Sequence, residues 1–150
     1  MDESGISTHL QREYARAPIG KIIEDIKHGK KFERINVIGA LCGKEHYAIE
    51  CYRHTTDGEF FESWFKSLLE KIPKKCTIIM DNARFHRKKE LYKLARGKAK
   101  LLFLPPYSPD YNPIEKSWAN MKRFICNNIK DFNSLNSAIY FYFDIKIKDY

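Results

Sequence analysis

Three carboxylates stand near points where short apolar runs of the chain end. Asp81 directly follows the run 78–80, Glu115 lies beyond the run 101–104, and Asp2 is at the amino terminus. Carboxylate oxygens are the ligands that Mg²⁺ prefers. Two such ions, roughly 3.5–4 Å apart, can serve the attacking and the leaving oxygen of an in-line displacement at phosphorus. These residues therefore predict a magnesium-dependent phosphoryl-transfer site, provided that the fold brings their side chains together.

The stretch between Asp81 and Glu115 begins with the pattern of a strand–helix–strand unit. Its apolar runs are short and β-prone, and a charged segment of helical length separates them. We therefore expect strands at 76–80 and 100–104 and a helix at 88–95. Strands connected in this way are parallel. Ligands gather at the carboxyl ends of such strands, and this is where Asp81 would lie.

Each acid also has an ordinary structural explanation. Asp81 could end a strand in a turn, because Asp favours turns. Glu115 lies three residues after Asn112, which is the spacing of a capping box at a helix start. Asp2 could be a solvated residue near a chain end. Two nearby acids compete for the same roles: Glu3 and Asp110.

The amino-terminal half predicts a sheet with one helix. Residues 1–5 read as the last part of a strand. Segments 34–42 and 46–52 are β-rich on either side of a short Gly-containing turn, which predicts an antiparallel hairpin. Apolar side chains recur at helical spacing over 60–72, so we expect a helix that Asp57 caps and Pro73 ends.

Two further helices and one long connection complete the expected order. Residues 9–32 are polar and basic and predict an excursion, with a short extended piece near 21–23. Asn112-Pro113 predicts a helix with Asn as the cap and Pro at its first position. Apolar spacing over 132–145 predicts the last helix.

Composition is that of one folded, basic domain. The chain has 150 residues, 43% of them hydrophobic, and a net charge of +8. This charge indicates a polyanionic partner such as nucleic acid, or else a basic protein with solvated charges. The four cysteines lack zinc-site spacing and predict buried free thiols. Without an export signal or a membrane-length apolar run, we expect a cytoplasmic protein with no membrane partner.

Basic residues concentrate directly after Asp81. The segment 84–100 holds eight Lys or Arg residues and a single acid, Glu90. We expect it to contact DNA phosphates, although a solvated helix is the simpler alternative. Lys122 lies two turns beyond Glu115 on nearly the same side of a helix, and Arg123 adjoins it. The expected DNA-contacting residues are Arg84, Arg87, Lys88, Lys89, Lys122 and Arg123.

Four segments, in this order, resemble the catalytic domain of DDE transposases: MDESG, RINVIGAL, IIMDNARFH and LPPYSPDYNPIEKSWANMK. Within that family, the mariner-like bacterial insertion sequences are the most similar group. The resemblance covers Asp2 to about Phe124, and its last segment is the most specific. The 33 residues between Asp81 and Glu115 match the family's spacing.

The resemblance implies a ribonuclease-H-like α/β fold, a mixed sheet with central parallel strands flanked by helices. It also implies a triad of Asp2, Asp81 and Glu115 that holds two Mg²⁺ ions, with Mn²⁺ as a substitute. Family members nick DNA at element ends and then use the freed 3′-hydroxyl to attack target DNA. The implied partners are element-end and target DNA and a second copy of the chain, with no small-molecule substrate. His86 could contact DNA, order its loop or be an unliganded surface residue, and we assign it no catalytic role.

The chain departs from the family pattern at its start. Family members carry an amino-terminal helix-turn-helix region, which we expect to be absent, so that 1–150 is one catalytic domain. Their first strand is central, between the hairpin and the 76–80 strand, and here we expect it to be truncated. An inactive remnant that only binds DNA is therefore an alternative. Another nuclease on this fold, such as a resolvase, is disfavoured by the PPYSPDYNPIE segment.

Overall fold

The computed structural model describes residues 1–7, 18–19, 33–73, 75–106 and 108–144. The extended piece expected near 21–23 lies outside these residues, as does most of the excursion. The strands are β1 (Asp2–Ser7), β2 (Arg34–Cys42), β3 (Glu45–Tyr52), β4 (Cys76–Met80) and β5 (Ala99–Phe103). The helices are α1 (Gly58–Lys71), α2 (Lys88–Ala95), α3 (Ile114–Asn128) and α4 (Leu135–Tyr142), with short 3-10 turns at Pro109–Tyr111 and Ile129–Asp131.

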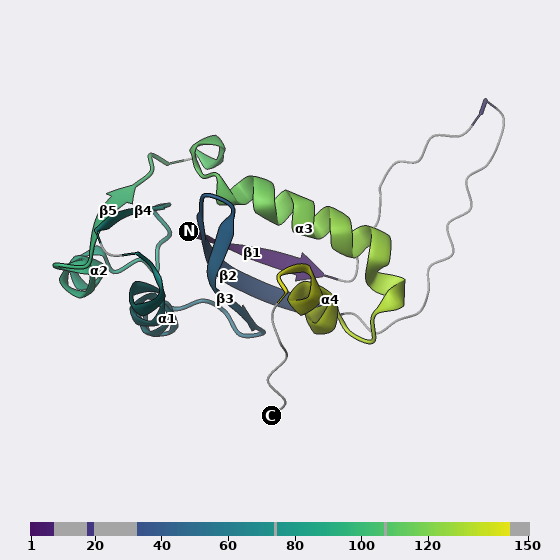
Figure 1. Ribbon diagram of the computed structural model, residues 1–150, viewed down its shortest axis with the longest axis horizontal. Helices are drawn as coiled ribbons and strands as arrows, with labels where there is room; N and C mark the ends of the chain where they lie inside the picture. Colours follow the sequence, from purple (N-terminus) through teal and green to yellow (C-terminus); the bar gives the residue numbers. More distant parts are fainter. Residues whose placement is uncertain (8–17, 20–32, 74, 107, 145–150) are drawn as a thin grey trace.

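The described strands form two sheets. β1, β2 and β3 make an antiparallel sheet in that order, and β4 and β5 make a parallel pair. Helices α3 and α4 pack on the three-stranded sheet, whereas α2 accompanies the parallel pair (Figure 1). Strand β2 contributes to two cores, because Ile35 and Val37 face α3 and α4 while Ile38 and Ala40 face α1 and β4. Burial on both faces explains why this strand is apolar almost throughout.

Local patterns predicted most element boundaries. The β4–α2–β5 unit has the expected parallel strands, and the β2–β3 hairpin forms with an irregularity between Ile38 and Ala40. The Asp57 side chain accepts a hydrogen bond from the Phe60 amide at 2.8 Å, so it caps α1 as expected. The last helix is shorter than predicted. It begins only after Ser134, because the Ser134 side chain forms a capping box with Ser137 and so fixes the helix start.

The first strand differs from the expected arrangement. Strand β1 runs to Ser7, two residues beyond its expected end, but it forms no ladder with β4 among the described residues. One backbone bond joins the two strands, from the Met1 amino group to the Ile79 carbonyl at 2.8 Å. The pairing of β1 with β2 begins at Asp2, opposite Gly39. After Gly39, the remaining residues of β2 have no partner in β1, and they face β4 across a cavity of about 130 Å³.

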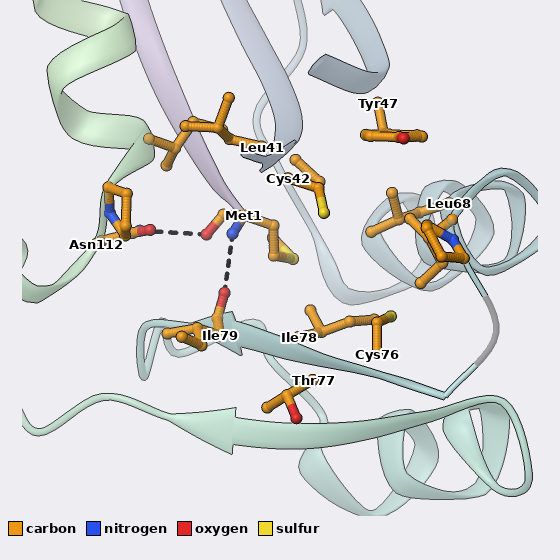
Figure 2. Close-up of a pocket in the computed structure, with 15 residues that line it drawn as sticks. Met1, Leu41, Cys42, Tyr47, Leu68, Cys76, Thr77, Ile78, Ile79 and Asn112 are labelled. Atoms are coloured by element: carbon orange, nitrogen blue, oxygen red, sulfur yellow. Dashed lines mark hydrogen bonds between the residues drawn. The ribbon is translucent and has the colours of Figure 1, made fainter. Parts of the chain in front are cut away.

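Figure 2 shows Met1 at this cavity, between Leu41 and Cys42 of β2 and Ile78 and Ile79 of β4. The lining is mostly apolar. Burial lowers the pKa of the Met1 amino group, because a charged amine loses hydration there. A neutral backbone amide at this position could donate the same hydrogen bond without that cost.

We therefore expect that three valines added ahead of Met1 will stabilise the fold. They would extend β1 between β2 and β4, and new backbone hydrogen bonds and apolar burial should raise the free energy of unfolding by about 2 kcal/mol. Chemical denaturation measures the change. Three prolines added at the same place cannot pair in a ladder and should give no gain. Equal effects of the two extensions would contradict this interpretation of the cavity.

Candidate active site

All three predicted acids line one cleft of about 400 Å³. Asp2 is the first residue of β1, Asp81 directly follows β4, and Glu115 is in the first turn of α3. The fold thus brings together side chains that lie far apart in the sequence. As the side chains stand, no group of three His, Cys, Asp or Glu residues within the described part of the chain is close enough to hold a metal ion. The acids share the cleft without converging on one point.

Trp118 holds Asp2 in place. Its indole Nε1 donates a hydrogen bond to Asp2 Oδ2 at 3.2 Å, and Trp118 itself is only 1% exposed. A Cβ on Gly39, opposite Asp2 in the sheet, would lie 3.2 Å from the Trp118 ring and 2.3 Å from Ile49 Cδ1. Glycine therefore leaves room for the indole beside Asp2. Trp118 is a core residue, and no sequence pattern pointed to this hydrogen bond.

Asn112 has a different role from the one expected. Its side chain donates to the Met1 carbonyl at 3.2 Å, and α3 begins after Pro113 with no side-chain cap hydrogen bond. The prediction of an Asn cap was therefore wrong, and so was the capping-box explanation for Glu115. Asn112 binds Met1 instead, and Glu115 is exposed at the cleft.

Asp81 both forms a turn and faces the cleft. Its Oδ1 accepts a hydrogen bond from the Ala83 amide at 3.2 Å, which is the turn that the simpler explanation predicted. The side chain is nevertheless 51% exposed. The neighbouring Asn82 donates to the Leu104 carbonyl at 2.6 Å and so ties the end of β4 to the end of β5. Asp81 thus stands on a fixed strand end.

Negative charge accumulates in the cleft. The pKa of Asp2 is raised to about 7, first by burial and then by the negative charges of Glu115, Glu3 and Asp81. Neighbouring carboxylates repel one another unless protons or cations bind. Oxygen donors of this kind suit hard divalent ions. The donor type therefore suits Mg²⁺ or Mn²⁺, although the three side chains do not converge as they stand.

Two of the predicted DNA-contacting residues have partners within the protein. Arg87 Nε lies 2.7 Å from Glu62 Oε1 on α1, and Lys88 Nζ lies 4.6 Å from the centre of the Phe103 ring. Each contact engages part of the cation's charge and of its hydrogen-bonding groups, which leaves less of them for a DNA phosphate. Arg84, Lys89 and Arg123 are exposed and Lys122 is half-buried.

The cysteine prediction was wrong in one respect. Cys42 is exposed and the other three cysteines are half-buried, so none of them is fully buried. Burial raises the pKa of the Cys51 thiol to about 12, which keeps it protonated and inert. None of the helices that the structure describes is long and apolar enough to cross a membrane.

Comparisons with known proteins agree with the resemblance seen in the sequence. Residues 1–136 match the family described as DDE superfamily endonuclease, whereas no functionally curated protein matches. Among solved structures, the chain is similar to a Mos1 transposase paired-end complex with left transposon end, with a TM-score of 0.67 and 14% sequence identity. The match covers 97% of this chain and 48% of that one, so this chain spans about half of its length. This likeness confirms the expected ribonuclease-H-like α/β fold. The chain belongs to the DDE superfamily endonuclease family.

Proposed function

We propose that this chain is the catalytic domain of an insertion-sequence transposase that cuts DNA at element ends and joins them to target DNA. The observation that carries the proposal is the single cleft lined by Asp2, Asp81 and Glu115. Family membership supports it. The similar Mos1 transposase was solved with a transposon end, which makes DNA the expected substrate here.

The three carboxylates are the proposed ligands of two Mg²⁺ ions, with Mn²⁺ as a substitute. When bound, the ions would stabilise charge on the attacking and leaving oxygens of a phosphodiester. The chain's own contribution is to position the ligands. Trp118 holds Asp2, the turn at Ala83 holds Asp81, and the first turn of α3 presents Glu115.

Nicking and strand-transfer assays test the proposal. The substrate is duplex DNA carrying the ends of the element that encodes the chain, offered intact and as pre-cut ends with free 3′-hydroxyls. We expect nicking and joining with Mg²⁺ or Mn²⁺ and none with EDTA. Cleavage that persists in EDTA would contradict the proposal. Binding of these ends without any reaction in Mn²⁺ would favour the DNA-binding alternative.

One observation favours that second candidate, a chain that binds DNA without cutting it. Strand β1 begins at Asp2, and strand β4 ends just before Asp81. Among the described residues, one backbone hydrogen bond joins this end of β1 to β4, where a ladder would supply several. The spacing between the two acids then depends on few contacts. This candidate predicts salt-sensitive binding and no divalent-dependent cleavage. A homodimer on DNA remains a prediction, which sedimentation of the protein–DNA complex can measure.

Removing the indole hydrogen bond should weaken the metal site. Trp118→Phe keeps an aromatic side chain in the core but leaves Asp2 without this donor. Loss of a partner that orients a ligand typically costs 10–100-fold in metal affinity, so we expect a decrease of about 10-fold. Titration with Mn²⁺ measures it. Trp64→Phe is the matched control, because Trp64 Nε1 donates to the Ala48 carbonyl, away from the acids. Equal losses in both variants would contradict a specific role for Trp118.

DNA binding should depend steeply on salt. Each phosphate contact contributes about −0.9 to the slope of log K against log salt. Changing both Arg84 and Lys89 to alanine should therefore make the slope shallower by roughly 2 if each contacts one phosphate. Fluorescence anisotropy at several salt concentrations measures it. Lys66→Ala on the exposed side of α1 serves as the control. An unchanged slope in the double variant would place the DNA elsewhere.

A further inference from the structure

His86 lies buried beside the acid cleft without lining it. Its side chain has 0% exposure, and the ring centres of Phe61 and Phe85 are 4.3 and 4.7 Å away. The residue is in the loop between β4 and α2. Because the side chain is buried, the two alternatives that place it at the surface, a DNA contact and an unliganded surface residue, are wrong.

One ring nitrogen of His86 binds Asp81. Nδ1 lies 3.1 Å from the Asp81 carbonyl oxygen and 3.3 Å from Asp81 Oδ1. Both oxygens face it as acceptors, so Nδ1 must carry the hydrogen. The Nδ1–H group of His86 thus contacts both the backbone carbonyl and the side-chain carboxylate of Asp81, a proposed metal ligand.

The other ring nitrogen faces the first strand. Nε2 lies 3.9 Å from Oε1 of Glu3, the residue after Asp2. These two atoms are buried and, among the described residues, have no hydrogen-bond partner. Unpaired buried polar atoms are costly and rare in folded proteins, and those that persist call for an explanation. Here they face each other across the boundary between the two sheets.

This boundary is where the proposed metal site needs support. Asp2 and Asp81 come from strands joined by one backbone hydrogen bond, from Met1 to Ile79. The 3.9 Å approach of His86 Nε2 to Glu3 Oε1 is a second place where the same two parts of the chain meet, although no hydrogen bond joins the two atoms. The His86 ring packs against Phe61 and Phe85. In this position its Nδ1 side faces Asp81 and its Nε2 side faces Glu3.

We propose that His86 is a positioning residue that sets the spacing between Asp81 and Asp2 through its contacts with Asp81 and Glu3. The inference rests on the proposed function, because it assumes that both acids hold divalent ions. Sequence reasoning left open that His86 merely orders its loop. The contact with Glu3 gives it a specific task between the two strands.

Two substitutions at His86 separate its contacts. In His86→Asn, the amide nitrogen falls near the position of Nδ1 and can still donate to Asp81. In His86→Gln, the amide reaches toward Glu3 and the donor to Asp81 is lost. His86→Asn loses the contact with Glu3, because its shorter side chain ends near the position of Nδ1. His54→Asn, on an exposed residue, is the matched control.

The first measurement is Mn²⁺ affinity of the full chain without DNA, read from the electron paramagnetic resonance signal of free Mn²⁺. We expect His86→Gln to bind on the order of 10–100-fold more weakly. We expect His86→Asn, which loses the contact with Glu3, to bind Mn²⁺ more weakly as well, and His54→Asn to stay within about threefold of the parent chain. Equal affinity in His86→Gln and the parent chain would overturn the proposal. Equal affinity in His86→Asn and the parent chain would also overturn it, and so would an equal loss of affinity in the His54→Asn control.

A second measurement separates this inference from the proposed function. Amide hydrogen exchange in the metal-free protein reports whether residues 1–4 and 79–83 open together. His86→Gln and His86→Asn should each speed exchange in both segments, because each loses one of the two contacts, and His54→Asn should not. If the parent chain binds no Mn²⁺, the proposed function fails while exchange still decides the positioning role. Unchanged exchange in His86→Gln would overturn that role.

Discussion

Replacing Asp81 by alanine should lower divalent-dependent nicking on the order of 10³-fold, the upper range for removing one stabilising group from an active site. Asp81 stands on the end of a strand that is fixed by Asn82 and by the turn at Ala83, so no nearby carboxylate can take its place. DNA affinity should be unchanged or slightly higher, because a negative charge is removed. Gel assays of nicking and anisotropy of binding measure the two effects separately.

Asp110→Ala is the matched control for this substitution. Asp110 is an exposed acid in the turn Pro109–Tyr111, and it does not line the cleft that holds the three predicted acids. The control removes the same charge and should keep full nicking activity. Full activity in Asp81→Ala would contradict the assignment, and so would equal losses in the two variants.

The second large effect is a loss of stability as pH rises. The pKa of Asp2 is about 7 in the folded protein, from burial and then from Glu115, compared with 3.8 as its ordinary value. A raised folded-state pKa gives stability that is fully present below the unfolded value and is lost as pH rises through the folded value. Allowing for partial solvent screening, we expect the free energy of unfolding to fall by about 2 kcal/mol between pH 4 and 8 from this group.

Asp2→Asn isolates this contribution, because it keeps the shape of the side chain and removes its titration. Urea denaturation across the pH range should show a flatter profile for the variant. Mg²⁺ at pH 8 should restore stability to the parent chain, since an ion that binds only the folded state stabilises it. Profiles of equal steepness in the two proteins would rule out Asp2 as the source. No effect of Mg²⁺ at pH 8 would contradict the metal site.

Local sequence patterns predicted most of the helices and strands. The cap at Asp57, the hairpin around the Gly43 turn and the parallel strands on either side of α2 follow from rules that act over a few residues. The boundaries of the hairpin, of α1 and of the β4–α2–β5 unit agree closely with the predicted ranges. The last helix shows the limit of these rules. The apolar spacing begins at residue 132, ahead of the cap at Ser134, so it predicted a helix that starts too early.

Contacts between distant residues were not predictable in the same way. Asn112 has a residue type and spacing that favour a cap, yet its side chain binds Met1, which is 111 positions away. Trp118 meets Asp2 across 116 positions. The only sequence signal was general, namely that a buried indole N–H seeks an acceptor. Which acceptor it finds depends on how α3 lies against β1.

The buried pair of His86 and Glu3 belongs to the same class. The sequence shows a His five residues after Asp81 but gives no sign that it is buried or that it faces the first strand. The split between the two sheets was also beyond local rules. It depends on where the ladder of β1 with β2 begins, at Asp2, and on how far β4 lies from that point.

Titration calorimetry with Mn²⁺ on the full chain tests the central claim most directly. If Asp2, Asp81 and Glu115 hold a pair of divalent ions, the parent chain should bind two ions. Asp2→Asn, Asp81→Ala and Glu115→Gln should each weaken or remove binding, and Asp110→Ala should not. Unchanged stoichiometry and affinity in a chain that carries all three substitutions would contradict the account.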